Sequence, residues 1–273
     1  MLHRAITVRT WSPVRSALPR LAHLARGLTS PADAPAPAEK KPKPPVNRTS
    51  TTIEVIISKI FPAGFGWQAA SVVAGDQGFE ADSLNFALTT GLGDFTGVLV
   101  GHSALAVLKV AVGRSHHLGT DLVTGLWLAT AAFCSGSAWQ PTVNFLHDAA
   151  NCSFMQTAVG CGAVTGAAFF AGLRIGRIIF KPLGLPGADY DNLCGDAMLS
   201  ASIGAATGTF VGTDISFKDN VLMPFFGVTD SMSSLEGCIR AGASTSAGFL
   251  CMQTAQNLVL PRGANWIDPV KLK

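Results

Sequence analysis

The sequence predicts an all-α fold: a polytopic membrane bundle of about six transmembrane helices that contains a duplicated helical hairpin. The first observation is composition, since 48% of the 273 residues are hydrophobic and only 14% are charged, whereas soluble domains carry roughly 25% charged residues. The second is a series of apolar stretches long enough to cross a bilayer. The third is an alternation of basic and non-basic connections between these stretches. Such a chain cannot cover a water-facing surface, so we expect most of it to lie in lipid.

The first 28 residues carry five arginines and no acidic residue, with leucines interspersed among them. The arginines are Arg4, Arg9, Arg15, Arg20 and Arg26. This pattern is typical of a mitochondrial transit peptide, and the spaced arginines exclude the uninterrupted apolar core of a secretory signal. We predict a transit peptide over 1–28 that is cleaved near Leu28. Its removal changes the formal net charge from +3 to about −2, because it leaves 15 basic and 17 acidic residues.

A linker rich in proline and lysine follows over 29–50. It has six prolines between Pro31 and Pro45, together with Lys40, Lys41 and Lys43. Proline at this density blocks both helix and sheet, so the segment is predicted to be extended and disordered.

Six segments between residues 51 and 262 approach the length of about 20 mainly apolar residues that a transmembrane helix needs. They are 55–75, 84–110, 122–146, 154–174, 197–217 and 237–260. Lys59 and Pro62 interrupt the first, and three threonines interrupt the fifth. Buried helices of a soluble protein are the alternative, and the scarcity of charge argues against them. Residues 51–262 are therefore predicted to form the transmembrane bundle, followed by a tail over 263–273.

Basic residues fall in every second connection between these segments. Lys and Arg occur before the first segment, in the second and fourth connections and after the sixth segment, whereas the first and third connections have none and the fifth sets Lys218 against three acids. Loops with excess Lys and Arg stay on the side from which the protein inserts. The pattern predicts both termini, including the tail, in the matrix of a mitochondrion, with the bundle in the inner membrane. A plastid membrane is the second choice.

Internal repetition indicates how the bundle is organised. The segment 64–68, Gly-Phe-Gly-Trp-Gln, is echoed 72 residues later by Gly-Ser-Ala-Trp-Gln at 136–140. The segment 91–97, Gly-Leu-Gly-Asp-Phe-Thr-Gly, is echoed 69 residues later by Gly-Cys-Gly-Ala-Val-Thr-Gly at 160–166. We interpret the first two helices as a hairpin duplicated by the next two. Partial echoes near Gly204 and Gly242 suggest a third, degenerate copy.

Small residues recur at a spacing of four in these segments, which permits close approach of helix backbones in lipid. The predicted helix-packing residues are Gly93, Gly97, Gly101, Gly162, Gly166, Gly204, Gly208 and Gly212. They predict a tight bundle, a homo-oligomer or a contact with a larger inner-membrane complex. The GxGxxTG motif is followed by no GKS or GKT and lies within an apolar span, so it does not indicate a nucleotide site.

Asp94 and His102 are the candidate transport or coupling residues. An ionisable side chain inside a span is costly and usually faces the bundle interior, a water-filled cavity or a partner charge. The two residues lie eight positions apart, about 12 Å along a helix, and His102 is a possible partner of Asp94 in proton transfer. The alternative is structural: Asp94 would tie helices together through hydrogen bonds to Gln140, Asn144 or Gln156.

Two functions of different class follow. In the first, the protein passes a small solute, ion or proton through the glycine-rich bundle, with Asp94 and His102 along the route. In the second, it is a non-catalytic accessory membrane subunit of a respiratory, ATP-synthase or protein-import complex, and the glycines form its docking faces. The sequence has no hydrolytic, redox or cofactor constellation, no metal-ligand cluster and no nucleic-acid-binding patch, so we expect neither an enzyme nor a cofactor.

Overall fold

The computed structural model describes residues 48–113, 118–180, 193–211 and 234–259. The predicted transit peptide over 1–28, the linker up to residue 47, the tail over 263–273 and Gly212 lie outside the described residues.

Every regular element in the described ranges is helical, which confirms the all-α part of the predicted fold class. The chain runs through α2 (Arg48–Val55), the π-helical turn η1 (Ile56–Ile60), α3 (Phe61–Asp76), α4 (Leu84–Ala111), α5 (Leu118–Asn144), the π-helical turn η2 (Phe145–Ala149), α6 (Phe154–Phe180), α7 (Leu193–Val211) and α9 (Ser234–Val259). Each of the six predicted apolar segments corresponds to one of α3, α4, α5, α6, α7 and α9.

Pro62 accounts for the π turn that joins α2 to α3. Proline lacks an N–H, and its ring clashes with the carbonyl of the residue four positions earlier, here Ser58. The helix widens directly upstream, where the Phe61 N–H donates to the Ile56 carbonyl, five residues back. The helix therefore continues through Lys59 and Pro62, the residues that weakened the first predicted segment.

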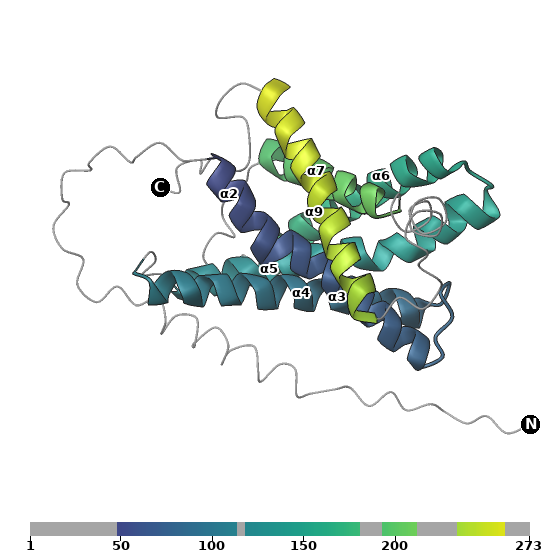
Figure 1. Cartoon of the computed structure of the whole chain (residues 1–273), viewed down its shortest axis with the longest axis horizontal. Helices are drawn as coiled ribbons and strands as arrows, with labels where there is room; N and C mark the ends of the chain where they lie inside the picture. The colour runs from purple at the N-terminus through teal and green to yellow at the C-terminus, as the bar shows by residue number, and fades with distance from the viewer. Residues whose placement is uncertain (1–47, 114–117, 181–192, 212–233, 260–273) are drawn as a thin grey trace, which may run out of the picture.

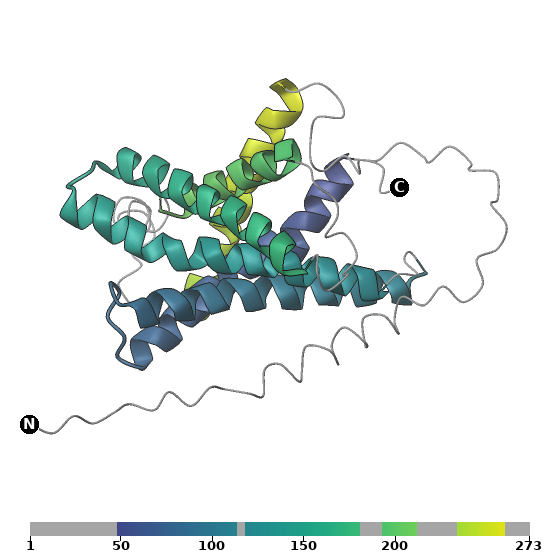
Figure 2. The same cartoon turned by 180° about the vertical axis from the view of Figure 1, so that it is seen from behind.

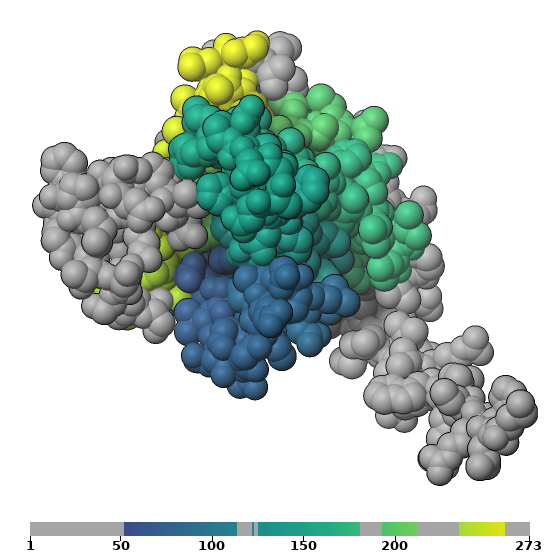
Figure 3. All heavy atoms as spheres, turned by 90° about the vertical axis from the view of Figure 1, so that its right-hand side faces the viewer, coloured from purple at the N-terminus to yellow at the C-terminus, as the bar shows by residue number. Residues whose placement is uncertain are grey.

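The six helices α3, α4, α5, α6, α7 and α9 form a closed ring. Each packs against the next in this order, and α9 packs against α3. In Figure 1, α4 and α5 lie nearly parallel and α9 crosses them steeply, and Figure 2 shows α6 and α7 on the opposite side. Figure 3 views the bundle from the end at which α3 turns into α4, with the α3–α4 hairpin in blue below α5 and α6. First and last helices are thus neighbours.

Two of these helices, α4 and α6, are long and apolar enough to cross a membrane. Large apolar side chains cover their outer faces: Val100 is 62% exposed, Val159 70% and Ile178 72%. Soluble proteins rarely present apolar surface of this kind without a partner. Polar side chains, among them Thr90, Thr157, Thr165, Ser202 and Gln253, are instead fully buried inside the ring.

The helix contacts are made backbone to backbone at glycines. Gly97 packs on the Pro62 carbonyl so closely that a Cβ would overlap it, and Gly93 and Gly66 face one another in the same way. A Cβ on Gly162 would lie 2.5 Å from the Gly204 carbonyl oxygen. Gly101, Gly166 and Gly208 also lie at helix contacts.

The two glycine motifs that match in sequence do not face equivalent neighbours. Gly93 and Gly97 pack against α3, the preceding helix, whereas Gly162 and Gly166 pack against α7, the following helix. The matching glycines of this motif therefore do not make equivalent helix contacts, and the duplicated hairpin stays a prediction. Each ring helix has a neighbour on both sides, so glycines of similar sequence context can point to different ones.

We expect Gly162→Ala to lower the free energy of unfolding by about 1–3 kcal/mol, because the added methyl group forces α6 away from α7. Gly75→Ala is the matched control: Gly75 is also helical, and a Cβ there would meet nothing within 4 Å. Its higher helix propensity predicts unchanged or greater stability. Chemical unfolding of the detergent-solubilised protein measures both, and equal losses in the two variants would contradict the close packing.

Candidate functional site

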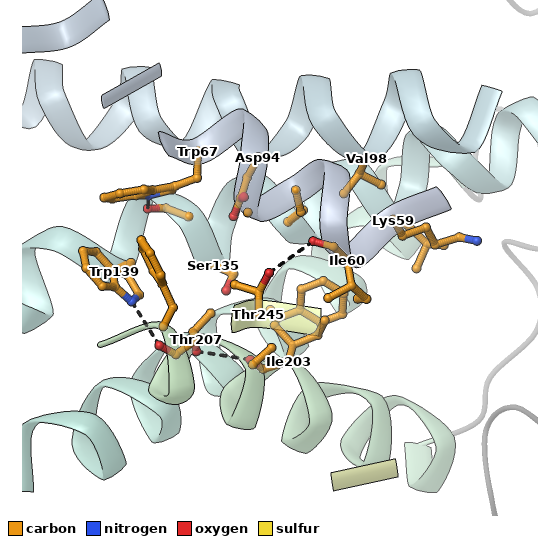
Figure 4. A pocket seen from close by; sticks show the side chains of 18 of the residues that line it. Lys59, Ile60, Trp67, Asp94, Val98, Ser135, Trp139, Ile203, Thr207 and Thr245 are labelled. Atoms are coloured by element: carbon orange, nitrogen blue, oxygen red, sulfur yellow. Dashed lines mark hydrogen bonds between the residues drawn. The ribbon is translucent and has the colours of Figure 1, made fainter. Parts of the chain in front are cut away.

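A cavity of about 80 Å³ lies inside the ring, lined by residues from η1 and from every ring helix. Most of its lining is apolar. Among the described lining residues, only Asp94 and Lys59 are ionisable, and the polar remainder includes the hydroxyls of Ser135, Thr207 and Thr245. Figure 4 shows aromatic side chains at one end, Lys59 at the other, and Asp94 between them.

Three aromatic rings from three helices meet at one end of the cavity. Trp67 of α3 and Trp139 of α5 have ring centroids 4.6 Å apart, and Phe210 of α7 lies 5.5 Å from Trp67 and 4.9 Å from Trp139. We call these residues the aromatic trio. Both indole N–H groups are used, because Trp67 donates to the Gly136 carbonyl at 3.1 Å and Trp139 donates to the Thr207 carbonyl at 3.3 Å. The trio therefore presents ring faces and edges to the cavity, not hydrogen-bond donors.

Asp94 reaches the cavity because α5 has a glycine opposite it. A Cβ on Gly136 would lie 2.5 Å from Oδ2 of Asp94, so any larger residue would displace the carboxylate. Asp94 is 9% exposed and makes no hydrogen bond or ion pair within the described part of the chain. The carboxylate lies next to the cavity, as Figure 4 shows. A buried carboxylate without a partner is costly and therefore uncommon outside functional sites.

The structural alternative predicted hydrogen bonds from Asp94 to Gln140, Asn144 or Gln156, and the structure places these three side chains in other contacts. The Gln140 side chain donates to Asn144 at 2.8 Å, one turn along the same helix. The Gln156 side chain accepts from the Ser153 N–H at the start of α6, also at 2.8 Å. Polar side chains near helix ends often form hydrogen bonds within their own helix. The sequence pattern alone did not distinguish such local bonds from hydrogen bonds between helices.

Ser135 is a second polar group that reaches the cavity without a partner. Its side chain is 2% exposed, and its hydroxyl makes no hydrogen bond in the described structure. The other two hydroxyls are committed to carbonyls: Thr245 donates to Ala241 at 2.9 Å and Thr207 donates to Ile203 at 3.1 Å. Sequence reasoning missed Ser135, because a serine inside an apolar helix usually bonds to its own backbone.

His102 does not line the cavity. It lies two turns beyond Asp94 on the same side of α4, where its ring packs over Gly125 of α5. Both sequence-predicted residues therefore face α5, each opposite a glycine. Only Asp94 reaches the cavity on the ring axis.

Asp94 lies at the contact between α4 and α5, and polar residues lie at comparable places in the α6–α7 and α9–α3 contacts. Asp94 of α4 faces Gly136 of α5, and Thr245 of α9 faces Gly64 of α3. Thr165 of α6 hydrogen-bonds to Thr207 of α7. Gly64, Gly136 and Thr207 each lie three residues before a member of the aromatic trio. The carboxylate thus occupies a place where the other two contacts have a threonine.

Buried and half-buried ion pairs lie at the end of the bundle where α4 and α6 terminate. Arg177 of α6 is bonded to Asp196 of α7 at 2.8 Å and lies over the Trp127 ring, 4.8 Å from its centroid. Lys109 of α4 pairs with Glu54 of α2 at 2.6 Å. These pairs were not predicted as a site. Their residues are far apart in sequence or sit in connections, where sequence patterns give no distance.

No protein-family model, curated protein or solved structure matches this chain. Within the described ranges, no cluster of three or more His, Cys, Asp or Glu residues is placed to hold a metal ion.

The two buried carboxylates should respond oppositely to neutralisation. Asp196→Asn leaves Arg177 without its buried counter-charge and should cost about 3–5 kcal/mol of unfolding free energy. Asp94→Asn removes an unpaired carboxylate and should leave stability unchanged or raise it, as is common where a residue is retained for function. Unfolding of both variants in detergent tests this. A large loss of stability in Asp94→Asn would make Asp94 a structural residue.

Proposed function

We propose that this chain is a six-span protein of the mitochondrial inner membrane that passes a small solute, ion or proton through the cavity inside the helix ring. The observation that carries this proposal is Asp94: a buried carboxylate with no partner in the described structure, facing an axial cavity. The Arg-rich first 28 residues support the mitochondrial location. The alternating basic connections support a matrix position for both termini.

The distribution of side chains supports insertion of all six helices, although α4 and α6 alone meet the criteria of length and apolarity. Exposed leucine, isoleucine and valine on the outside and buried threonine, serine and glutamine on the inside suit a bundle surrounded by lipid. In lipid, close glycine contacts and interhelical hydrogen bonds are the forces that hold helices together.

Three equivalent contacts support a threefold hairpin repeat made of α3–α4, α5–α6 and α7–α9. In each case a glycine on one hairpin lies close to a carbonyl oxygen of the next hairpin. An added Cβ would lie 2.9 Å from the Phe133 oxygen at Gly91, 2.5 Å from the Gly204 oxygen at Gly162 and 2.9 Å from the Phe61 oxygen at Gly242. Gly91 and Gly162 are 71 residues apart, as are Phe133 and Gly204. This spacing agrees with the offset of 72 between Trp67 and Trp139.

Under a mechanism of alternating access, the contacts on either side of the cavity would act as its gates. The aromatic trio closes the end nearer the α3–α4 turn. The Arg177–Asp196 and Lys109–Glu54 pairs join helices at the opposite end, which the basic connections assign to the matrix. Transport would require the trio and these pairs to open in turn.

In liposomes, the purified protein should carry protons, potassium or methylammonium faster than empty vesicles do. We expect Asp94→Asn to lower that flux at least tenfold, because it removes the acidic group that faces the cavity. Asp76→Asn, which neutralises an exposed acid at the end of α3, is the matched control and should retain it. His102→Gln should lower proton flux if His102 passes the proton on. Flux that survives in Asp94→Asn would refute the proposal.

Two outward-facing grooves favour the second candidate, an accessory subunit of a respiratory, ATP-synthase or import complex. One lies between α6 and α7 and measures about 940 Å³, and the other lies between α3 and α4 and measures about 710 Å³. Glycines of the helix contacts and apolar side chains line both grooves. A transmembrane helix of a partner subunit would therefore fit them.

Native gel electrophoresis of the endogenous protein, extracted in mild detergent, separates the two candidates. A transporter should migrate as a monomer or small homo-oligomer. Migration only with a large complex would instead support the accessory role, and Val159→Trp, at an exposed residue that lines the α6–α7 groove, should then release the protein from that complex.

A further inference from the structure

We propose that the cavity binds a small organic ammonium cation, either a protonated primary amine or a compact quaternary ammonium group. This inference deepens the proposed function, since it names the substrate class of the same cavity. It rests on four properties of the lining: its charge, its aromatic wall, its free oxygen atoms and its size.

The charge of the cavity favours a cation. Asp94 brings a carboxylate that no described residue neutralises. The ammonium group of Lys59, the other ionisable lining residue, donates a hydrogen bond to the Ser58 hydroxyl at 3.2 Å. The Lys59 side chain points away from Asp94 in Figure 4. An anion would find a carboxylate in the cavity, and both indole N–H groups there are already bonded to carbonyls.

The aromatic trio suits an organic cation. Ring faces attract ammonium groups, and recognition of quaternary ammonium by several aromatic rings is the best-known use of this interaction. The three rings pack against one another, with centroids 4.6 to 5.5 Å apart, and together form one wall of the cavity that an ammonium group would contact. Alkyl groups of the ligand would meet apolar lining residues such as Val98 and Phe169.

The free oxygen atoms are too few for a bare metal ion. Calcium takes six to eight oxygen ligands and magnesium requires six. The described lining has five side-chain oxygen atoms, two from Asp94 and one each from Ser135, Thr207 and Thr245, which is fewer than either ion takes. Of these, the Asp94 carboxyl group and the Ser135 hydroxyl are not bonded to a backbone carbonyl, whereas both threonine hydroxyls are. A primary ammonium group needs only a few acceptors, and these two groups provide them.

The volume sets an upper limit on the ligand. A water-sized probe needs about 10–15 Å³ of this kind of volume, so a cavity of about 80 Å³ holds roughly five water-sized groups. Methylammonium and tetramethylammonium are within this limit.

Binding is tested with the purified full-length chain in detergent, using thermal unfolding and titration calorimetry. We expect methylammonium chloride and tetramethylammonium chloride each to raise the unfolding temperature by several degrees at millimolar concentration. Sodium and potassium chloride at the same ionic strength should give no such shift. Equal shifts with all four salts, or none with either ammonium salt, would overturn the inference.

Variants assign the binding to the cavity. Asp94→Asn should weaken the binding of both ammonium ions at least tenfold, and Asp76→Asn should leave it unchanged. Gly136→Ala, which displaces the Asp94 carboxylate without changing its charge, is a second route to the same loss. Ser135→Ala should weaken methylammonium binding several-fold and leave tetramethylammonium binding intact, because only the former has N–H groups to donate. Full binding in both Asp94→Asn and Gly136→Ala would refute the site.

Failure of this inference is distinguishable from failure of the proposed function. Proton or potassium flux that depends on Asp94, without ammonium binding, overturns the ligand class and leaves the transport proposal in place. Ammonium binding that depends on Asp94, without flux of any of the three ions in liposomes, supports the ligand class and removes transport.

Discussion

Direct contact between helix backbones is the constraint on which the rest of this structure depends. At Gly91, Gly162 and Gly242 a helix lies against a carbonyl oxygen of its neighbour with no room for a side chain. Such contacts bring six helices into a closed ring, and closure brings α9 against α3. The ring in turn places Trp67, Trp139 and Phe210 together on its axis and leaves a cavity beside them. Substitution of these glycines would therefore act on the cavity through the helix positions.

Within this ring, Asp94 differs from the polar residues at the comparable helix contacts and from the other buried acid of the described structure. Thr165 and Thr245, which occupy corresponding contacts, bond to carbonyls one turn back. The buried acid Asp196 is paired with Arg177. Retention of one unpaired carboxylate in an apolar cavity is energetically unfavourable, and function is the usual reason for such a residue to persist. A cationic ligand would supply the missing charge.

The helices and the candidate residue Asp94 could be predicted from the sequence. The residues that line the cavity and the pairs formed between helices could not, because they depend on contacts between segments that are far apart in the chain. Apolar length predicted the six helices, and the rarity of charge singled out Asp94. The repeat was predicted from motifs offset by 72 and 69 residues, and it stays a prediction; the glycines of the second motif, Gly93 and Gly162, face different neighbours in the structure. Ser135 and the Arg177–Asp196 pair were missed, since a cavity and a pairing across helices appear only when the ring is closed.

Water access to Asp94 tests the central claim most directly. In a chain whose six native cysteines are replaced, single cysteines at Asp94 and at Val100 are compared in liposomes. Both lie on α4, and Val100 is 62% exposed on the outer face. Because a thiol must ionise in water to react, a cavity inside a membrane-embedded ring predicts that Asp94→Cys reacts with a small cationic methanethiosulfonate while Val100→Cys, facing lipid, does not. Reaction at Val100→Cys with protection at Asp94→Cys would identify a water-soluble bundle with a closed core and contradict the account.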